Sequence, residues 1–524
     1  MRICLISREY PPDTGWGGIG AYTFQHARAL KEQGHDVEVI SLTAKEAPAD
    51  SFRPADPSDP GSVPVHRAVW GPLFQELTTV WISLPYTHLS LKSSFALWRK
   101  FMEVHSLKPF DVVEAPEHLG EALFPALTHI CPLVLRLHTP HSKLMQERYH
   151  NINSAFDQEL VAILERMTML EADLLSSPSE DLAAYVASDT GVKSSSIEIV
   201  RNPVDCQNFT PDGPQAIAPD GRVTVFFAGR LEERKGMHFL VEAVPIVLKS
   251  CPKTRFLIVG ADTNTGPGKT SVLAALKQKL SASGGDAAVQ FISHVALERM
   301  AAHYRSADMC VVPSLYENAP YTVLEAQACG KPVVGTAAGG SKEYIADGET
   351  GYVVPPSDAQ SLAESIIKLV ADQGLRRKMG EAARQRSLAK FDRKIIVGQA
   401  LASYELAVTR YQSQVDTALY KRSVEQSLRD FVSLMYAYHL NLCDLVYRHS
   451  LEYRVKTWLQ LAFKRPRLCG AKIALGVLKG LRDNFGLASP PVENLIAKIA
   501  TQVSEREAEK ERLILQALMQ ECKI

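Results

Sequence analysis

Short apolar runs alternate with helix-like patterns over residues 1–208. The apolar runs read RICLIS, DVEVISL, DVVEAP, PLVLRLH, ADLLSSPS and IEIVRNP. Between the first two runs, YTFQHARALKEQG places its apolar residues on one face of a helix that ends at Gly34. Strands that alternate closely with helices are typical of a parallel, doubly wound sheet. We therefore expect residues 1–208 to form a Rossmann-like α/β domain.

A second alternating series follows the stretch FTPDGPQAIAPDG, whose Pro, Gly and Asp residues are typical of a linker between domains. The apolar runs of this series read VTVFFAGR, RFLIVGA, AVQFISHV, DMCVVPS and KPVVGTA. They continue to about Val354, and helical patterns then extend to about Gln412. The sequence therefore predicts a second Rossmann-like domain, residues 209–412, with a cleft between the two domains.

Residues 413–524 predict an α-helical extension, because strand patterns disappear from about Ala418 onward. Residues 424–445 repeat apolar positions at the spacing of a coiled-coil seam, which either packs against another tail helix or joins two copies in a homodimer. Residues 448–482 carry nine basic residues and one acidic residue. This segment is either a basic helix that contacts an anionic membrane surface or a solvated basic face.

The composition narrows the class of protein. Of the 524 residues, 46% are hydrophobic and 22% are charged, as in ordinary globular proteins. The 58 basic residues balance the 58 acidic ones, so the overall charge predicts no nucleic-acid partner. The nine cysteines form no CxxC pair, and we expect them to be reduced and buried. Because no apolar run reaches the roughly 18 residues of a membrane span, we expect a cytoplasmic protein that contacts a membrane at most peripherally, at its inner face.

The stretch YENAPYTVLEA contains two glutamates eight positions apart, Glu317 and Glu325. Asn318 is a good N-cap residue, Pro320 is favoured in a first helical turn, and Gly330 is a typical helix end. The free N–H groups of this helix start form an anion site that lies between the two carboxylates. Such a site suits a ligand with a sugar on one side of a diphosphate and a ribose on the other.

Two cations follow the first strand of the second domain, in AGRLEERKG. Arg230 comes directly after the strand, and Lys235 comes five residues later. Because ligands bind at strand ends in a doubly wound sheet, these cations are candidates for neutralising a diphosphate. The alternative is that they form ion pairs with Glu232 or Glu233.

Two loops of the first domain carry further candidates. DTGWGGIGAYTF follows the first strand, and its glycines allow backbone N–H groups to approach an anion closely, although the spacing is not that of a dinucleotide fingerprint. LRLHTPH ends another strand and contains His138 and His141, either of which is a site residue or a polar loop histidine. Glu114 and Glu117 are candidates for acceptor contacts.

The segment PSLYENAPYTVLEAQACGKPVVGTAAGGSKEYIADGETGYVV closely resembles the donor-site block of glycosyltransferase family 4, which has the GT-B fold. The resemblance covers residues 1 to about 410 and leaves out the helical tail. It implies a retaining hexosyltransferase that uses a nucleotide-sugar donor as a substrate and needs no metal or other cofactor. The implied acceptor is a sugar, a lipid-linked glycan or a small molecule, as in polysaccharide biosynthesis.

The resemblance also implies roles for individual residues. Glu317 would contact the hydroxyls of the donor sugar and Glu325 the ribose, while His138 would lie near the reacting sugar. The remaining donor contacts would come from Gly17, Gly18, Arg230, Lys235, Asn318, Ala319, Tyr321 and Thr322. Many family members have Phe-Gly where this chain has Asn-Ala-Pro after the first glutamate. Since Pro320 has no N–H, the phosphate contacts are expected from neighbours such as Tyr321 and Thr322.

Two other classes of function stay open at this point. The same fold carries nucleotide-sugar epimerases and phosphorylases, although the chain shows no motif for a pyridoxal lysine. A non-catalytic scaffold that acts through the helical tail is the third interpretation. The sequence does not determine the nucleotide base, the sugar or the acceptor.

Overall fold

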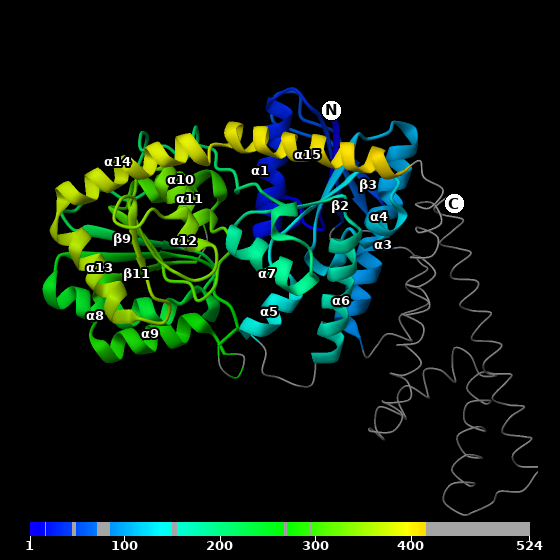
Figure 1. Cartoon of the computed structure of the whole chain (residues 1–524). Helices are drawn as coiled ribbons and strands as arrows, with labels where there is room; N and C mark the ends of the chain where they lie inside the picture. Colours follow the sequence, from blue (N-terminus) through cyan, green and yellow to red (C-terminus); the bar gives the residue numbers. More distant parts are fainter. Residues whose placement is uncertain are drawn as a thin grey trace, which may run out of the picture.

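The computed structural model describes residues 1–15, 17–43, 49–70, 84–148, 155–266, 268, 270–293 and 295–415. These residues form two α/β lobes that lie side by side (Figure 1). The predicted seam at 424–445, the basic segment at 448–482 and all but the first three residues of the predicted extension lie outside the described residues. No helix in the described part of the chain combines the length and apolar character that a membrane span requires.

The first lobe is built on an eight-stranded sheet with the order β3-β4-β2-β1-β5-β6-β7-β8. All neighbouring pairs are parallel except β3 and β4. The strands are β1 (Arg2–Ile6), β2 (Asp36–Leu42), β3 (Ser51–Arg53), β4 (Val65–Ala68), β5 (Val112–Pro116), β6 (Leu133–Arg136), β7 (Leu174–Ser177) and β8 (Ile197–Ile199).

Both faces of this sheet are covered, which explains why its strands are apolar without alternation. In β1, Ile3 and Leu5 join one core cluster, whereas Cys4 and Ile6 join another on the opposite face. The helices of this lobe are α1 (Gly18–Glu32), α3 (Pro85–Leu107), α4 (Leu123–Thr128), α5 (His141–Arg148), α6 (Ala155–Glu171) and α7 (Glu180–Thr190). Gly34 follows α1 with a positive φ of 89°, so the predicted end of this helix is confirmed.

The second lobe holds a six-stranded parallel sheet with the order β11-β10-β9-β12-β13-β14. Its strands are β9 (Val223–Ala228), β10 (Thr254–Val259), β11 (Val289–Ile292), β12 (Met309–Val312), β13 (Val333–Thr336) and β14 (Gly351–Val354). Its helices are α8 (Met237–Ser250), α9 (Val272–Ser283), α10 (Leu297–Arg305), α11 (Tyr321–Ala328), α12 (Ser341–Tyr344), α13 (Ala359–Ala371) and α14 (Gln373–Lys390). The predicted class, two doubly wound α/β units, is confirmed.

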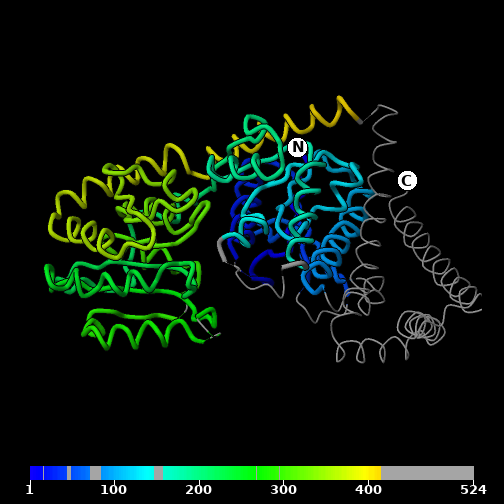
Figure 2. The backbone as a smooth tube through the Cα atoms, turned by 60° about the horizontal axis from the view of Figure 1, so that its bottom comes forward, coloured from blue at the N-terminus to red at the C-terminus, as the bar shows by residue number. Residues whose placement is uncertain are grey.

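The last described helix returns from the second lobe to the first. α15 (Arg393–Val415) follows α14 and runs along α1, as both views show (Figures 1 and 2). Its residues Ile396, Val397 and Tyr404 join the core cluster that contains Ile3 and Leu5 of β1. Residues 393–415 therefore pack on the first sheet, although most of them belong by sequence to the predicted range 209–412.

Candidate functional site

Glu317 lies in the loop that follows β12, and three donors converge on one of its oxygens. Its Oε1 accepts hydrogen bonds from Arg234 at 3.1 Å, from Ser314 at 3.2 Å and from Lys235. Burial alone would raise the pKa of Glu317, but the charges of Lys235 and Arg234 outweigh this effect and lower it. The carboxylate is therefore ionised, and its side chain is only 12% exposed.

Backbone packing explains why these residues meet. Gly236 has a φ of 66°, and a side chain there would collide with the carbonyl of Pro313. The turn that carries Arg234 and Lys235 (the short helix η4, Glu233–Lys235) thus lies directly on the loop after β12, and Leu315 N–H donates to Arg234 O at 2.8 Å. On the other side of the loop, Gly339 forms an isolated bridge with Glu317.

Arg230 lies apart from this cluster. Its side chain is 65% exposed and pairs with Glu232 at 2.8 Å, which is the ion pair that the sequence left open as an alternative. Arg234, which the sequence analysis passed over, occupies the position beside Lys235 at the carboxylate of Glu317. Its place in the same Arg-Lys-Gly turn as Lys235 was the available signal.

Asn318 does not cap α11, so that prediction is wrong. The helix begins at Tyr321, and the residue in the N-cap position is Pro320, with φ −71° and ψ 114° and no side-chain cap. Proline holds this extended geometry and moves the helix start three residues beyond Asn318. The Asn318 side chain instead accepts a bond from Tyr316 OH at 2.6 Å and donates to His138 O and Thr139 Oγ1 in the first lobe.

The start of α11 offers free N–H groups. Val323 and Leu324 donate to the carbonyl of Pro320, whereas the N–H groups of Tyr321 and Thr322 have no acceptor among the described residues. The hydroxyl of Tyr321 is also buried without a described partner. Just before the helix, the carbonyl of Ala319 accepts a bond from Asn202 at 3.2 Å. The predicted end of the helix is confirmed by Gly330, which has a φ of 68°.

Glu325 lies on α11 in neutral surroundings. Its Oε2 accepts a hydrogen bond of 2.7 Å from the hydroxyl of Tyr304 in α10. Burial raises the pKa of Glu325 to about 7, and the bond from Tyr304 opposes this rise only in part. The side chain is partly exposed.

His138 lies just beyond β6, and a buried carboxylate holds its main chain. The N–H of His138 donates to both carboxylate oxygens of Glu117 at 2.9 Å. Burial raises the pKa of Glu117 to about 7. Burial and then the charge of Arg136 hold the pKa of His138 well below its usual value, so the ring is neutral. The ring meets Tyr22 edge-on, with the centroids 5.3 Å apart.

A small cavity beside His138 lies at the carboxyl ends of β1, β5 and β6. It is lined by Tyr22, Glu114, Arg136 and His138 among others. Glu114 accepts bonds from Tyr22 at 3.0 Å and from Tyr404 of α15 at 2.9 Å. Both carboxylates named as candidate acceptor contacts, Glu114 and Glu117, are therefore buried and already engaged.

His141 has a different environment from His138. It is the first residue of α5, its ring is buried, and its N–H donates to the buried carboxylate of Glu165 at 2.5 Å. The glycine loop starts α1: a side chain at Gly17 would collide with the carboxylate of Glu9, whereas Gly18 faces open space. The Glu9 side chain can move away from Gly17, but a side chain at Gly20 would meet the carbonyl of Gly15, so the close backbone approach in this loop is at Gly20.

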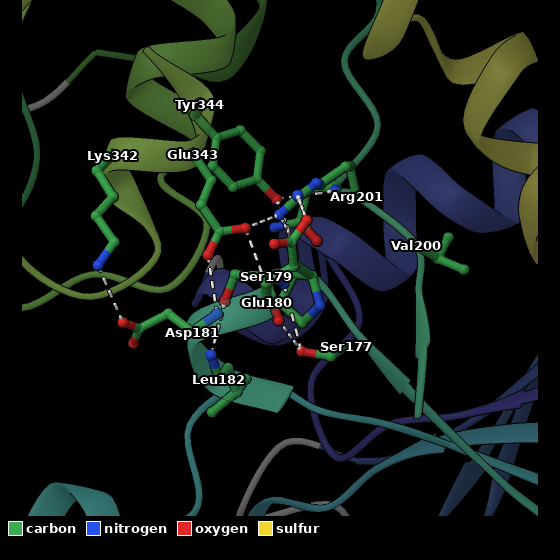
Figure 3. A network of polar contacts seen from close by, with 12 residues as sticks. Ser177, Ser179, Glu180, Asp181, Leu182, Val200, Arg201, Lys342, Glu343 and Tyr344 are labelled. Carbon is green, nitrogen blue, oxygen red and sulfur yellow. Dashed lines mark hydrogen bonds and ion pairs between the residues drawn. The ribbon is translucent and has the colours of Figure 1, made fainter. Parts of the chain in front are cut away.

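A second contact joins the two lobes at α12, which the sequence analysis did not find. Glu343 accepts bonds of 2.9 Å from the N–H groups of Glu180 and Asp181 in the first turn of α7, and it pairs with Arg201 (Figure 3). The hydroxyl of Tyr344 donates to Pro178 O at 2.7 Å. A carboxylate at a helix N-terminus is stabilised by the free N–H groups and the helix dipole.

In this part of the molecule, the Asn318 side chain of the second lobe contacts the main chain of His138 in the first, and Glu317, which is held by Lys235, is its neighbour in sequence. Across the described residues, no group of three or more His, Cys, Asp or Glu side chains is arranged to hold a metal ion.

Comparison with known protein families shows which family this chain belongs to. Residues 16–208 match the family described as Glycosyltransferase Family 4, and residues 211–386 match the family described as Glycosyl transferases group 1. The chain belongs to glycosyltransferase family 4. The predicted family is therefore confirmed, and the two matches meet in the linker between the sheets of this glycosyltransferase.

The chain matches two curated relatives over nearly the whole length of each relative. The glycosyltransferase is 28% identical over 438 residues to the glycogen synthase of Mycobacterium tuberculosis strain H37Rv, a match that covers 82% of this chain and 100% of the relative. It is 31% identical over 423 residues to the D-inositol 3-phosphate glycosyltransferase of Mycolicibacterium smegmatis, with 79% of this chain and 92% of the relative covered.

Solved structures share the fold of this glycosyltransferase. The sucrose-phosphate synthase of Thermosynechococcus elongatus matches with a TM-score of 0.63 and 24% identity, covering 77% of this chain and 98% of that chain. The Anabaena protein HepE in complex with UDP-glucose matches with a TM-score of 0.56 and 20% identity, covering 77% of this chain and all of that chain. The predicted GT-B fold is thereby confirmed.

Proposed function

We propose that this glycosyltransferase transfers a hexosyl unit from a nucleotide-diphosphate sugar to a sugar, lipid-linked or small-molecule acceptor, with retention of anomeric configuration. One observation carries the proposal. Glu317, held by Lys235 and Arg234, lies next in sequence to Asn318, whose side chain contacts the main chain of His138 from the other lobe. A donor sugar bound at Glu317 is thus brought toward a histidine of the first lobe.

The donor diphosphate would lie at the start of α11. There it would meet the positive end of the helix dipole and the free N–H groups of Tyr321 and Thr322. Lys235 and Arg230 would add positive charge beside the phosphates. The leaving diphosphate gains negative charge as the glycosidic bond breaks, so fixed positive groups stabilise the transition state more than the ground state. The exposed side chain of Arg230 is free to swing from Glu232 to a phosphate, and Gly17 and Gly18 would line the opposite side.

The two glutamates would hold the ends of the donor. Every described bond to Glu317 goes to Oε1, which leaves Oε2 for a hydroxyl of the sugar. Glu325 uses Oε2 for Tyr304 and leaves Oε1 for the ribose. The neutral ring of His138 would accept or donate a hydrogen bond at the reacting sugar. Because Glu317 is held in an ion pair, it is a poor nucleophile, which favours retention by front-face attack of the acceptor.

The curated relatives narrow the acceptor chemistry. Their names describe a glycogen synthase and a glycosyltransferase that acts on D-inositol 3-phosphate, so a glucan and a phosphorylated polyol are reasonable first acceptors for this chain. UDP-glucose, present in the HepE complex, is a reasonable first donor. At these levels of identity, the base, sugar and acceptor of this enzyme are left to experiment.

A donor screen followed by a transfer assay tests the proposal. The full chain is first screened by thermal shift against UDP-, ADP- and GDP-sugars. Nucleoside diphosphate release is then measured with a glucan, inositol 3-phosphate or a lipid-linked sugar as acceptor, and the anomeric configuration of the product is read by NMR. We expect Arg230→Ala, Lys235→Ala and Glu317→Ala each to lower transfer by at least about 10-fold while the chain stays folded. Transfer at wild-type rates by all three variants would show that the site is misassigned.

A further inference from the structure

We propose that Asn318 is a positioning residue that sets the main chain of His138 from the opposite lobe, so that the histidine is placed only when the two lobes meet. This inference rests on the proposed transfer reaction. It assigns to the Asn318 side chain a task other than binding the donor, which was its expected role.

The side-chain amide of Asn318 contacts one main-chain carbonyl and one hydroxyl of the first lobe. The amide nitrogen of Asn318 donates to His138 O and to Thr139 Oγ1, and the latter distance is 2.5 Å. The hydroxyl of Thr139 donates in turn to His138 O at 2.7 Å. The carbonyl of His138 therefore accepts two bonds, one from its own lobe and one from the other.

The orientation of the Asn318 amide follows from its surroundings. A carbonyl oxygen accepts hydrogen bonds only, so the group that faces His138 O must be the NH₂ of the amide. Its Oδ1 then faces Tyr316 OH, which donates to it at 2.6 Å. Rotation of the amide by half a turn would place two oxygens against each other, and the contact is therefore specific for asparagine.

The other side of His138 is held within its own lobe. Its N–H donates to both oxygens of Glu117, which is fully buried. Glu117 and His138 both belong to the first lobe, so this contact stays in place when the lobes separate. The bond from Asn318 does not, and its loss would free one of the two peptide groups that set the direction of the His138 ring.

Asn318 moves with the carboxylate that would hold the sugar. Glu317 is its neighbour in sequence and bridges to Gly339, while a side chain at Gly340 would collide with Asn318 O. The segment that carries both residues is thus packed closely against the loop that follows β13. When the lobes approach, Glu317 and the restraint on His138 arrive together, which would couple placement of the sugar to placement of the histidine.

The substitution Asn318→Asp tests this coupling. It keeps the shape and the acceptor for Tyr316 but places an oxygen against His138 O. With saturating donor and acceptor, we expect kcat to fall about 10- to 100-fold, while the Kd for the nucleoside diphosphate, measured by calorimetry, stays within about twofold. Asn208→Asp, the same change at an exposed position, is the matched control and should keep wild-type kcat.

A double-mutant cycle with Thr139 completes the test. Thr139→Val alone should lower kcat about 3- to 10-fold, Thr139→Ser should restore it, and Thr139→Val should cost little more once Asn318→Asp is present. If Asn318→Asp does not fold, Asn318→Ser, which is too short to reach His138, takes its place. An unchanged kcat, or a Kd that rises as far as kcat falls, would overturn the positioning role. If the wild-type chain transfers no sugar from any donor, the proposed function itself fails.

Discussion

Glu317 and Glu325 are the same residue type on one short segment, yet the protein surrounds them differently. Glu317 stands in a loop with Lys235 and Arg234 at one of its oxygens, and these charges lower its pKa despite burial. Glu325 stands on α11 with the neutral hydroxyl of Tyr304 as its partner, and burial raises its pKa to about 7. One carboxylate is a fixed charge, and the other titrates near neutral pH.

The difference shows that partners, and not spacing, assign the chemistry of such a pair. A fixed anion between two cations holds a precise geometry and accepts strong bonds from sugar hydroxyls. A carboxyl group that is half protonated near pH 7 makes a weaker and pH-dependent contact. We therefore expect the Glu317 end of the site to control turnover and the Glu325 end to adjust donor affinity.

Glu317→Gln should have the largest effect. The amide keeps the shape but loses the charge, so Lys235 and Arg234 remain beside a neutral group and sugar hydroxyls lose a charged acceptor. We expect kcat/KM for transfer to fall about 100- to 1000-fold. Glu233→Gln, the same change at an exposed position in the same turn, is the control. If both variants transfer equally well, the fixed charge at Glu317 has no catalytic part.

Lys235→Met should come next. It removes one of the two charges that lower the pKa of Glu317, so this pKa rises and the carboxylate is protonated at a higher pH. We expect transfer at pH 7.5 to fall about 10- to 100-fold. As the pH is lowered, activity should be lost at a higher pH than in the wild-type enzyme. A pH profile with an unshifted acid limb would argue against this pairing.

The sequence predicted the sheets because both faces of each sheet are covered. A parallel strand such as β1 sends alternate residues into two cores, so every position is apolar and the run stands out. The helix pattern of residues 393–415 was equally visible. The sheet on which this helix packs was not visible, because the apolar face that carries Tyr404 could pack on either lobe.

The site was harder to predict where it depends on the other lobe. Glu317, Glu325 and Lys235 lie within local motifs whose turns bring them to one end of the second sheet. The direction of the Asn318 side chain depends on His138, 180 residues earlier in the chain. The cap that Glu343 places on α7 likewise depends on how the lobes meet. Local capping rules favoured Asn318 as an N-cap, but Pro320 moved the helix start.

Glu325→Gln should have a smaller effect that depends on pH. In the wild-type protein, the raised pKa of Glu325 adds stability that is complete below its unfolded value near 4.5 and is lost as the pH rises through about 7. Glutamine cannot ionise. The free energy of unfolding of the variant minus that of the wild type should therefore be larger at pH 8 than at pH 5 by about 2 kcal/mol.

Urea denaturation at both pH values measures this gain, and Glu364→Gln, in the exposed face of α13, should show none. The KM for the donor at pH 8 should rise less than about 10-fold, because one hydrogen bond to the ribose changes its acceptor. An equal stability difference at pH 5 and pH 8 would mean that Glu325 is ionised throughout, as Glu317 is.

Tyr304→Phe should have the smallest effect, a loss in free energy of unfolding that grows as the pH rises. The hydroxyl lowers the pKa of Glu325 through its hydrogen bond, so its removal raises that pKa further. The cost in free energy of unfolding should be about 1 kcal/mol at pH 5, where the carboxyl group is protonated, and larger at pH 8, where an ionised group loses its donor. Tyr411→Phe is the control, because the hydroxyl of Tyr411 donates to a main-chain carbonyl, that of His129, and not to a carboxyl group. Its deficit should be the same at both pH values, and if the deficit of Tyr304→Phe is also constant, the two ends of the YENAPYTVLEA segment differ less in charge than their partners indicate.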